Sequence, residues 1–212
     1  MPKIKTRDRI LRTALELFNT EGEAQVSTVD IASVIGISPG NLYYHFKGKE
    51  AIIEALFDDF EAELQQVLTA PINRPLAVED NWIFLYIVFE EINDFRFFYE
   101  AISSILERCP ALRPRFARLL SLKKKTCLAL LDGLESKDFI AVREEEKNRM
   151  AERFAMHMSF WIQYMSFSEV KDERAVIHQG VYNGLLQLAP FVKYDREAYT
   201  ALLTEYFQEQ SA

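Results

Sequence analysis

The sequence predicts an all-α protein, with an N-terminal three-helix helix-turn-helix domain joined by a long fourth helix to a larger helical domain. Glycine and proline are scarce, with seven of each among 212 residues. Apolar residues recur at helical spacing almost throughout, and no window alternates in the way a half-buried strand would. A segment near the N-terminus has the spacing of two short crossing helices. The expected domains are residues 1–49 and 50–212.

The first predicted helix covers about residues 6–20. Its apolar side chains recur at intervals of three and four residues between Ile10 and Phe18, so they share one face. Thr6 is the expected N-cap, because its hydroxyl can accept a hydrogen bond from the first turn, and Gly22 is the expected stop.

A helix, a tight turn and a second short helix are predicted next. Ser27 and Asp30 have the spacing of a capping box, which begins a helix that ends near Val34. Ala32 supplies the small side chain that two closely crossing helices need, and Gly36 tolerates a positive φ in the turn. The apolar residues expected to anchor the pair are Ile31, Val34, Ile37 and Leu42.

The third helix is expected to begin at Ser38 and to end near Phe46. Ser38 is a suitable N-cap, and Pro39 follows at the first helical position, where its missing N–H costs nothing. A helix that enters the major groove of DNA should expose polar and aromatic groups near its start. The residues that do so are Ser38, Gly40, Asn41, Tyr43, Tyr44 and His45. Residues 29–46 are therefore predicted to form a helix-turn-helix.

The remaining chain is predicted to be helical as well. A long amphipathic helix should follow Gly48 from about residue 49 to 68 and end at a linker of Pro71, Asn73 and Pro75. Further helices are expected near 78–93, 95–107, 111–135, 147–167, 172–190 and 195–209.

The charge distribution favours contact with DNA at one end of the chain. The net charge is −7, yet residues 1–50 hold seven basic and six acidic side chains, and the basic ones gather near residues 3–12 and 47–49. Arg7, Arg9 and Arg12 are expected to be solvated, with one of them helping on phosphate.

Other classes of protein find little support. Cys109 and Cys127 lack metal spacing and indicate buried thiols in a reducing cytoplasm rather than a redox switch. We find no nucleophile–base set, glycine-rich phosphate loop, signal peptide or membrane-spanning run. We therefore expect a cytoplasmic protein that is not an enzyme, with no catalytic residues, metal or cofactor.

The predicted helix-turn-helix and the residues on either side of it resemble the DNA-binding domain of the TetR family of bacterial transcriptional regulators. The resemblance rests on residues 6–11, Ala14, Phe18 and the segments 27–32, 36–46 and 49–50, within the first 55–60 residues. It implies a homodimer that binds a palindromic operator in double-stranded DNA and responds to a small apolar effector. The segment 38–46 and the body are also similar to regulators of polyhydroxyalkanoate-granule genes, which points to an acyl-type effector.

The family pattern can be transferred residue by residue. Tyr43 and His45 match a pair that contacts phosphate and base, Tyr44 a neighbouring aromatic, and Thr28 and Lys49 phosphate-contacting residues. Asn41 stands where the family commonly has threonine and could pair with adenine. The predicted DNA-binding residues are Thr28, Ser38, Pro39, Gly40, Asn41, Tyr43, Tyr44, His45 and Lys49. Alternatively, one of the two tyrosines packs inward, and His45 is a C-terminal cap.

The density of aromatic residues in the body suggests a long apolar pocket or an interface, although most of them are expected in the core. The consecutive residues 97–99 cannot all face one side of a helix. The predicted pocket residues are Phe60, Leu64, Trp82, Phe89, Phe98, Phe116, Phe154, His157, Met158 and Trp161. His157 could equally be a hydrogen-bonded core histidine.

A dimer interface is predicted from two glycines spaced four apart, because each destabilises a helix by about 1 kcal/mol and needs a compensating close approach. Its residues are Val176, Ile177, Gly180, Val181, Gly184, Leu185 and Leu188. The family resemblance implies a four-helix interface from this helix and the one before. The alternative is packing within the chain.

The function predicted from the sequence is that of a DNA-binding regulator, a repressor released by its effector. An activator of the same fold and a helical module acting through a protein partner are the alternatives. The basic residues Arg113, Arg115, Arg118 and Lys123–Lys125 are expected to form a solvated face rather than a second nucleic-acid patch.

Overall fold

A computed structural model describes residues 5–74, 76–77, 80–170 and 172–210, and over these residues the chain is helical, as predicted. The helices at the N-terminal end are α1 (Thr6–Leu17), α2 (Thr28–Ile35), α3 (Pro39–His45) and α4 (Lys49–Asn73). The remaining helices are α5 (Asp80–Asp94), α6 (Arg96–Glu100), α7 (Ile102–Arg108), α8 (Leu112–Ser136), α9 (Glu144–Met165), α10 (Glu173–Leu186) and α11 (Arg196–Gln210). Extended pairing in the described part is one isolated bridge, between Ile140 and Val192. Lys3, Pro75 and Lys171 lie outside the described residues.

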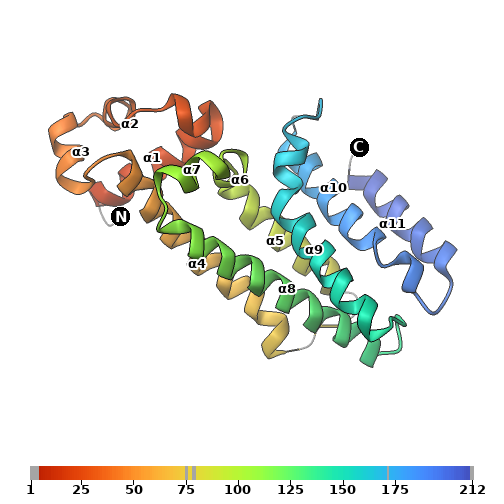
Figure 1. Cartoon of the computed structure of the whole chain (residues 1–212). Helices are drawn as coiled ribbons and strands as arrows, with labels where there is room; N and C mark the ends of the chain where they lie inside the picture. Colours follow the sequence, from red (N-terminus) through yellow and green to blue (C-terminus); the bar gives the residue numbers. More distant parts are fainter. Residues whose placement is uncertain (1–4, 75, 78–79, 171, 211–212) are drawn as a thin grey trace. The chain divides into compact units, whose positions relative to one another are not determined.

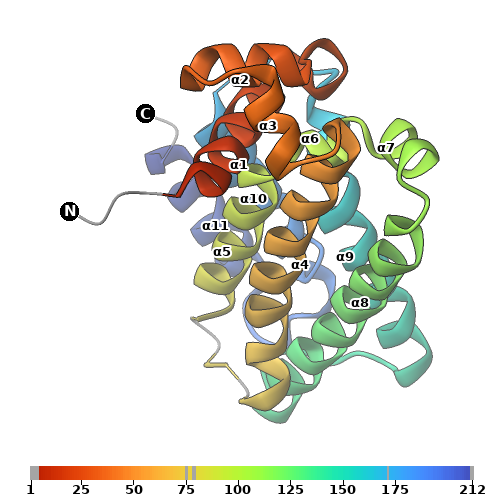
Figure 2. The same cartoon turned by 90° about the vertical axis from the view of Figure 1, so that its left-hand side faces the viewer.

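The chain folds as two compact units, and neither is a continuous stretch of sequence. The first unit contains the described residues up to 62 together with 94–116, and the second contains 63–93 together with the described residues from 117 onward. Helices α1, α2 and α3 of the first unit form one group (Figure 1). In the second unit α10 packs against both α9 and α11 (Figure 2). The functional boundary expected after residue 49 stays a prediction.

The starts of α2 and α3 follow the capping signals of the sequence, whereas the expected N-cap Thr6 is wrong, because Thr6 lies inside α1 and Lys5 precedes it without a side-chain cap. The Asp30 amide donates to Ser27 Oγ at 3.3 Å and the Ser27 amide donates to Asp30 Oδ2 at 2.8 Å, which completes the capping box. Gly36 ends α2 at φ 71°, in the left-handed region, and Ser38 accepts from the Asn41 amide at 3.2 Å. Helix α1 ends at Leu17 and is extended by a π-helical turn, Phe18–Gly22, where one longer α-helix was expected.

Aromatic side chains fill the core of the first unit. The Phe60 ring centroid lies 5.3 Å from Phe95, 5.7 Å from Phe98 and 5.9 Å from Tyr99. Phe97, next to them, lies 5.2 Å from Phe18 in the π-helical turn. Residues 97–99 are all buried. They lie together in the short helix α6, and the helix predicted at 95–107 is broken after it at Ala101, where φ is −118°.

Several predicted boundaries in the body are wrong. Pro71 and Asn73 belong to α4 rather than to a linker, since Pro71 lies in the last turn of the helix and is itself buried. Helix α9 begins three residues earlier than expected, at Glu144. Helix α10 ends at Leu186 because a short 3₁₀ turn, Ala189–Phe191, carries Pro190 and redirects the chain.

The second unit buries the cationic side chain of Lys123 almost completely. Lys123 on α8 is 1% exposed, and its Nζ donates to Ser159 Oγ on α9 at 3.1 Å. Burial lowers the pKa of the Lys123 ammonium to about 7. The expectation of a solvated face over Lys123–Lys125 is therefore wrong for Lys123, because the helix turns this residue inward while Lys125 is exposed.

Both cysteine thiols are free and buried, as the sequence indicates. Burial raises the pKa of the Cys127 thiol to about 12. Burial also raises the pKa of the Cys109 thiol, and the nearby carboxylates of Glu54 and Glu50 add to the rise. Each thiol is therefore held in its protonated form at neutral pH.

Candidate nucleic-acid interface

The two helices of the predicted helix-turn-helix are anchored by a few apolar side chains. Ile31 and Ala32 of α2 are completely buried, and Leu42 of α3 is 2% exposed. Ile37, in the turn, is half-buried. Val34 is 64% exposed, so its prediction as an anchor is wrong. With one buried residue on α3, most of that helix is left to face outward.

The outward face of α3 carries both tyrosines. Tyr43 is 57% exposed and Tyr44 is 78% exposed, so the alternative in which one of them packs inward is wrong. Ser38, Pro39, Gly40 and Asn41 are also exposed, while His45 is half-buried with its ring edge-on to Tyr44 at 5.3 Å. Predicted DNA-binding residues are thus brought together on one short helix. Thr28, at the first position of α2, is half-buried.

Basic side chains flank this aromatic face. Lys47 places its ammonium 4.5 Å from the centre of the Tyr43 ring, and Arg7 stacks its guanidinium 5.1 Å from the centre of the Phe46 ring. Arg9 donates to the carbonyl of Ile35 at 2.7 Å, at the end of α2. The sequence reasoning missed Lys47 as a site residue. A cation two residues after the helix and four positions beyond an exposed tyrosine was the available signal.

Lys49 is held by protein oxygens. Its Nζ donates to the carbonyls of Glu23 at 2.8 Å and Val26 at 3.0 Å, and it lies 2.9 Å from the Glu23 carboxylate. The side chain is 19% exposed. A phosphate contact, as the family pattern implies for Lys49, would therefore compete with three oxygen atoms of the same chain.

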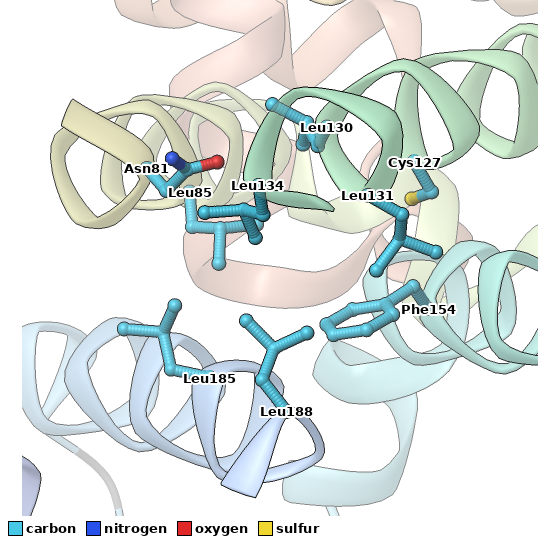
Figure 3. A pocket seen from close by; sticks show the side chains of 9 residues that line it. All are labelled: Asn81, Leu85, Cys127, Leu130, Leu131, Leu134, Phe154, Leu185 and Leu188. Carbon is cyan, nitrogen blue, oxygen red and sulfur yellow. The ribbon is translucent and has the colours of Figure 1, made fainter. Parts of the chain in front are cut away.

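The residues predicted to line one long pocket are distributed over both compact units. Phe60, Phe98 and Phe116 belong to the first unit, and the other seven, from Leu64 to Trp161, belong to the second. The second unit contains an apolar cavity of about 30 Å³. Figure 3 shows Leu131, Phe154 and Leu188 pointing into it. Its remaining lining residues are Asn81, Leu85, Cys127, Leu130, Leu134 and Leu185, so Phe154 is the predicted pocket residue that it contains.

His157 is placed as a hydrogen-bonded core histidine. Its Nε2 lies 2.8 Å from the carbonyl of Gly180, and its ring packs against Phe89 and Trp161. Burial lowers the pKa of His157 below its ordinary value of 6.5, and the Gly180 carbonyl offsets part of that effect. The imidazole is therefore neutral at pH 7.

The two glycines of α10 allow close packing inside the second unit, which corrects the reasoning that assigned them to a dimer interface. A Cβ atom on Gly180 would lie 2.9 Å from both Phe89 and Trp161. The residues predicted with it, Ile177, Val181, Gly184, Leu185 and Leu188, are buried in the same chain, and Val176 is half-buried. The close approach that the glycines make possible is therefore made to α5 and α9.

A different surface of the second unit is apolar and exposed. Met156, Phe160 and Tyr164 recur every fourth residue on α9 and are 59%, 43% and 67% exposed. Phe167, just beyond the helix, is 87% exposed. Side chains at this spacing share one helix face, so the second unit leaves a stripe of large apolar groups in contact with solvent.

The described residues offer no group of three or more His, Cys, Asp or Glu side chains arranged to hold a metal ion. None of the helices described is long and apolar enough to span a membrane.

Known protein families match both the N-terminal part of the chain and most of the remainder. Residues 10–56 match the sequence profile described as "Bacterial regulatory proteins, tetR family", and residues 59–199 match the one described as "Bacterial transcriptional repressor". The first match contains α2, α3 and all of the predicted DNA-binding residues.

Among solved structures, a TetR-family transcriptional regulator from Marinobacter aquaeolei VT8 is similar over nearly its whole length. The TM-score is 0.87 at 30% identity, with 96% of this chain and 99% of that chain covered. The similarity thus extends well beyond the helix-turn-helix.

Curated relatives match at the N-terminal end. The HTH-type transcriptional regulator UidR of Escherichia coli K12 is 47% identical over 51 residues, which is 24% of this chain and 26% of UidR. The HTH-type transcriptional repressor KstR2 of Mycolicibacterium smegmatis is 37% identical over 75 residues, 32% of this chain and 37% of KstR2. The matches span about a quarter to a third of these relatives. From the two profiles and the Marinobacter structure together, the chain belongs to the tetR family of bacterial regulatory proteins.

Proposed function

We propose that this protein is a homodimeric repressor that inserts α3 into the major groove of a palindromic operator and is released by a small apolar effector. DNA-binding transcriptional regulation follows from membership of the family. The proposal adds four points to this: repression, the dimer, the operator contacts and the effector. An activator of the same fold remains the alternative, since the contacts of α3 with DNA have the same form in both.

The observation that carries the DNA contacts is the outward face of α3. Tyr43 and Tyr44 are 57% and 78% exposed in a helix whose buried residue is Leu42. Two adjacent exposed aromatic side chains, rimmed by polar residues, form an apolar patch of the kind that marks a contact surface. Lys47 over the Tyr43 ring and Arg7 over the ring of Phe46 supply positive charge for phosphates. Asn41 offers an amide that can pair with adenine.

Operator binding by the Tyr43→Ala variant tests this proposal. Loss of a ring that contacts the DNA backbone or a base should weaken binding by roughly 1–3 kcal/mol, or about fivefold to somewhat over a hundredfold in Kd. Fluorescence anisotropy with the DNA upstream of the protein's own gene, or with sites selected from a random library, measures it at two salt concentrations.

Tyr194→Ala is the matched control, because Tyr194 is 66% exposed in the second unit. It should bind like the wild type. Equal affinities for the two variants would contradict the assignment of α3. Absence of binding by the wild type to any selected sequence would favour a module that acts through a protein partner.

The exposed stripe of α9 supports a dimer that uses this helix. Met156, Phe160, Tyr164 and Phe167 are the large apolar groups that a second copy would cover. Helix α9 is the helix before the one with the two glycines, so this surface agrees with the four-helix interface that the family resemblance implies. The contribution of α10 would come from residues other than its buried glycine face.

The apolar character of the core supports an apolar effector. The cavity at Phe154, Leu131 and Leu188 is lined almost entirely by carbon, with Asn81 and Cys127 as its polar groups. Its volume of about 30 Å³ is that of a single small group, so an acyl-type effector would have to open it. A thermal-shift screen of fatty acids and acyl esters of increasing length, followed by operator release, tests the effector class.

A further inference from the structure

A buried carboxylate lies between the DNA-binding helices and the rest of the first unit. Glu23 is the first residue of the short 3₁₀ turn between α1 and α2, and its side chain is 0% exposed. Two cations reach it: Lys49 Nζ lies 2.9 Å from Oε1, and Arg108 Nη2 donates to Oε2 at 2.5 Å. A buried carboxylate is costly unless it is paired. The stability of this cluster therefore depends on the two cations and on the short distances at which they are held.

The two cations come from two different helices. Lys49 is the first residue of α4, and it also donates to the carbonyls of Glu23 and Val26. Val26 directly precedes Ser27, the N-cap of α2. Arg108 is the last residue of α7 and also donates to Glu50 at 3.3 Å. The cluster therefore joins the entry to α2, the start of α4 and the end of α7.

A second link joins the same two segments. The Asn19 side chain, in the π-helical turn, donates to the carbonyl of Asp94 at 2.8 Å and accepts from the Phe97 amide at 3.2 Å. The chain between α1 and α2 is thus held at Asn19 by the start of α6 and at Glu23 by the end of α7. These contacts explain why residues 94–116 fold into one compact unit with the helix-turn-helix.

From this arrangement we propose that Arg108 is a positioning residue for operator binding: through Glu23 it fixes the turn before α2, and with it the orientation of α2 and α3 against α4. Arg108 belongs to neither of the two helices that would meet DNA. Its side chain is 33% exposed, and its guanidinium pairs with Glu23 and Glu50. The proposal rests on DNA binding by α3, as proposed above.

The test compares Arg108→Gln with Arg113→Gln, which removes an exposed arginine of the same unit. Operator affinity is measured on the selected palindrome and on versions with one or two base pairs added or removed between the half-sites. The wild type should prefer one spacing, because a rigid pair of recognition helices fits one separation. Arg108→Gln should lose roughly tenfold or more on the preferred spacing and little on the others, so its preference flattens. Arg113→Gln should behave like the wild type.

Two further variants separate positioning from simple loss of folding. Arg108→Lys keeps a cation at Glu23 and should restore most of the spacing preference. The double variant Glu23→Gln/Arg108→Gln removes the buried anion together with one of its partners, so that no buried carboxylate is left with Lys49 alone to balance it. It should melt near the wild-type temperature while keeping the flattened preference.

Three results would overturn the proposal. The first is an Arg108→Gln protein that binds every spacing as the wild type does. The second is an equal loss on all spacings accompanied by a lower melting temperature, which marks a structural role. The third is wild-type spacing preference in the double variant. If the wild-type protein binds no palindrome, the proposed function itself fails, and this inference fails with it.

Discussion

At the scale of single residues, Lys123 departs most from its expected environment. The sequence places it in a run of three lysines, which favours a solvated face, yet it is 1% exposed. The position of Lys123 on its helix indicates burial. Lys123 lies four residues from both Leu119 and Cys127, so it shares their helix face, and both of these residues are buried. Composition alone cannot distinguish Lys123 from Lys125, whereas its position on the helix can.

The buried ammonium of Lys123 should make stability depend on pH. Its folded-state pKa of about 7 lies below the ordinary value of 10.5. Between these two values the unfolded chain binds a proton that the folded chain does not. The free energy of unfolding should therefore rise with pH across this window, with a slope of at most about 1.4 kcal/mol per pH unit from this group.

Lys123→Met should remove that slope and raise the free energy of unfolding at pH 7, since no ammonium is then desolvated. Urea unfolding at pH 7, 8 and 9 measures both effects. Lys125→Met, which changes an exposed lysine, is the control and should keep the wild-type slope. A slope that persists unchanged in Lys123→Met would show that Lys123 does not titrate in this range.

At the scale of the elements, the starts of α2 and α3 were predictable and helix partners were not. The capping residues Ser27 and Ser38 act through hydrogen bonds to amides three residues away, so local sequence determines them. The glycines of α10 signalled a close approach correctly. The sequence had no means to tell whether the approaching surface belongs to the same chain, and the structure assigns it to Phe89 and Trp161.

The same glycine pair yields a matched comparison of two substitutions. In Gly180→Ala the new Cβ would meet Phe89 and Trp161 at 2.9 Å, and overpacking of this kind costs about 1–3 kcal/mol. In Gly184→Ala the nearest atoms are at 3.7–3.8 Å, an ordinary contact, so the better helix propensity of alanine should leave stability unchanged or raise it by about 1 kcal/mol. Urea unfolding of both variants decides the matter, and similar losses in both would argue against the packing described.

At the scale of the whole molecule, the sequence predicted the all-α class and the helix-turn-helix segment, because periodicity and capping act over short distances. The grouping of residues 94–116 with the N-terminal helices could not be predicted. It depends on Glu23 meeting Arg108 and on Asn19 meeting Asp94, pairs that are separated by 85 and 75 positions. Residue type and spacing carry no information about such pairs in a single sequence.

The proposed dimer is the prediction at this scale. Phe160→Glu places a carboxylate in the middle of the exposed stripe of α9, where a second copy would have to bury it without a partner. Sedimentation velocity should find a dimer for the wild type and a monomer for this variant, together with a large loss of operator affinity. Ile83→Glu, at a residue of α5 that is 56% exposed, should remain dimeric. A dimeric Phe160→Glu protein would exclude this face.

The protected state of the two thiols has a practical consequence. Cys109 and Cys127 are buried and held protonated, so a maleimide or a spin label should react with them slowly at neutral pH. A cysteine introduced at an exposed position would then be the preferred site of labelling without removal of the native ones. The distance between two recognition helices in solution could therefore be measured by fluorescence or electron-spin methods with one introduced cysteine per chain.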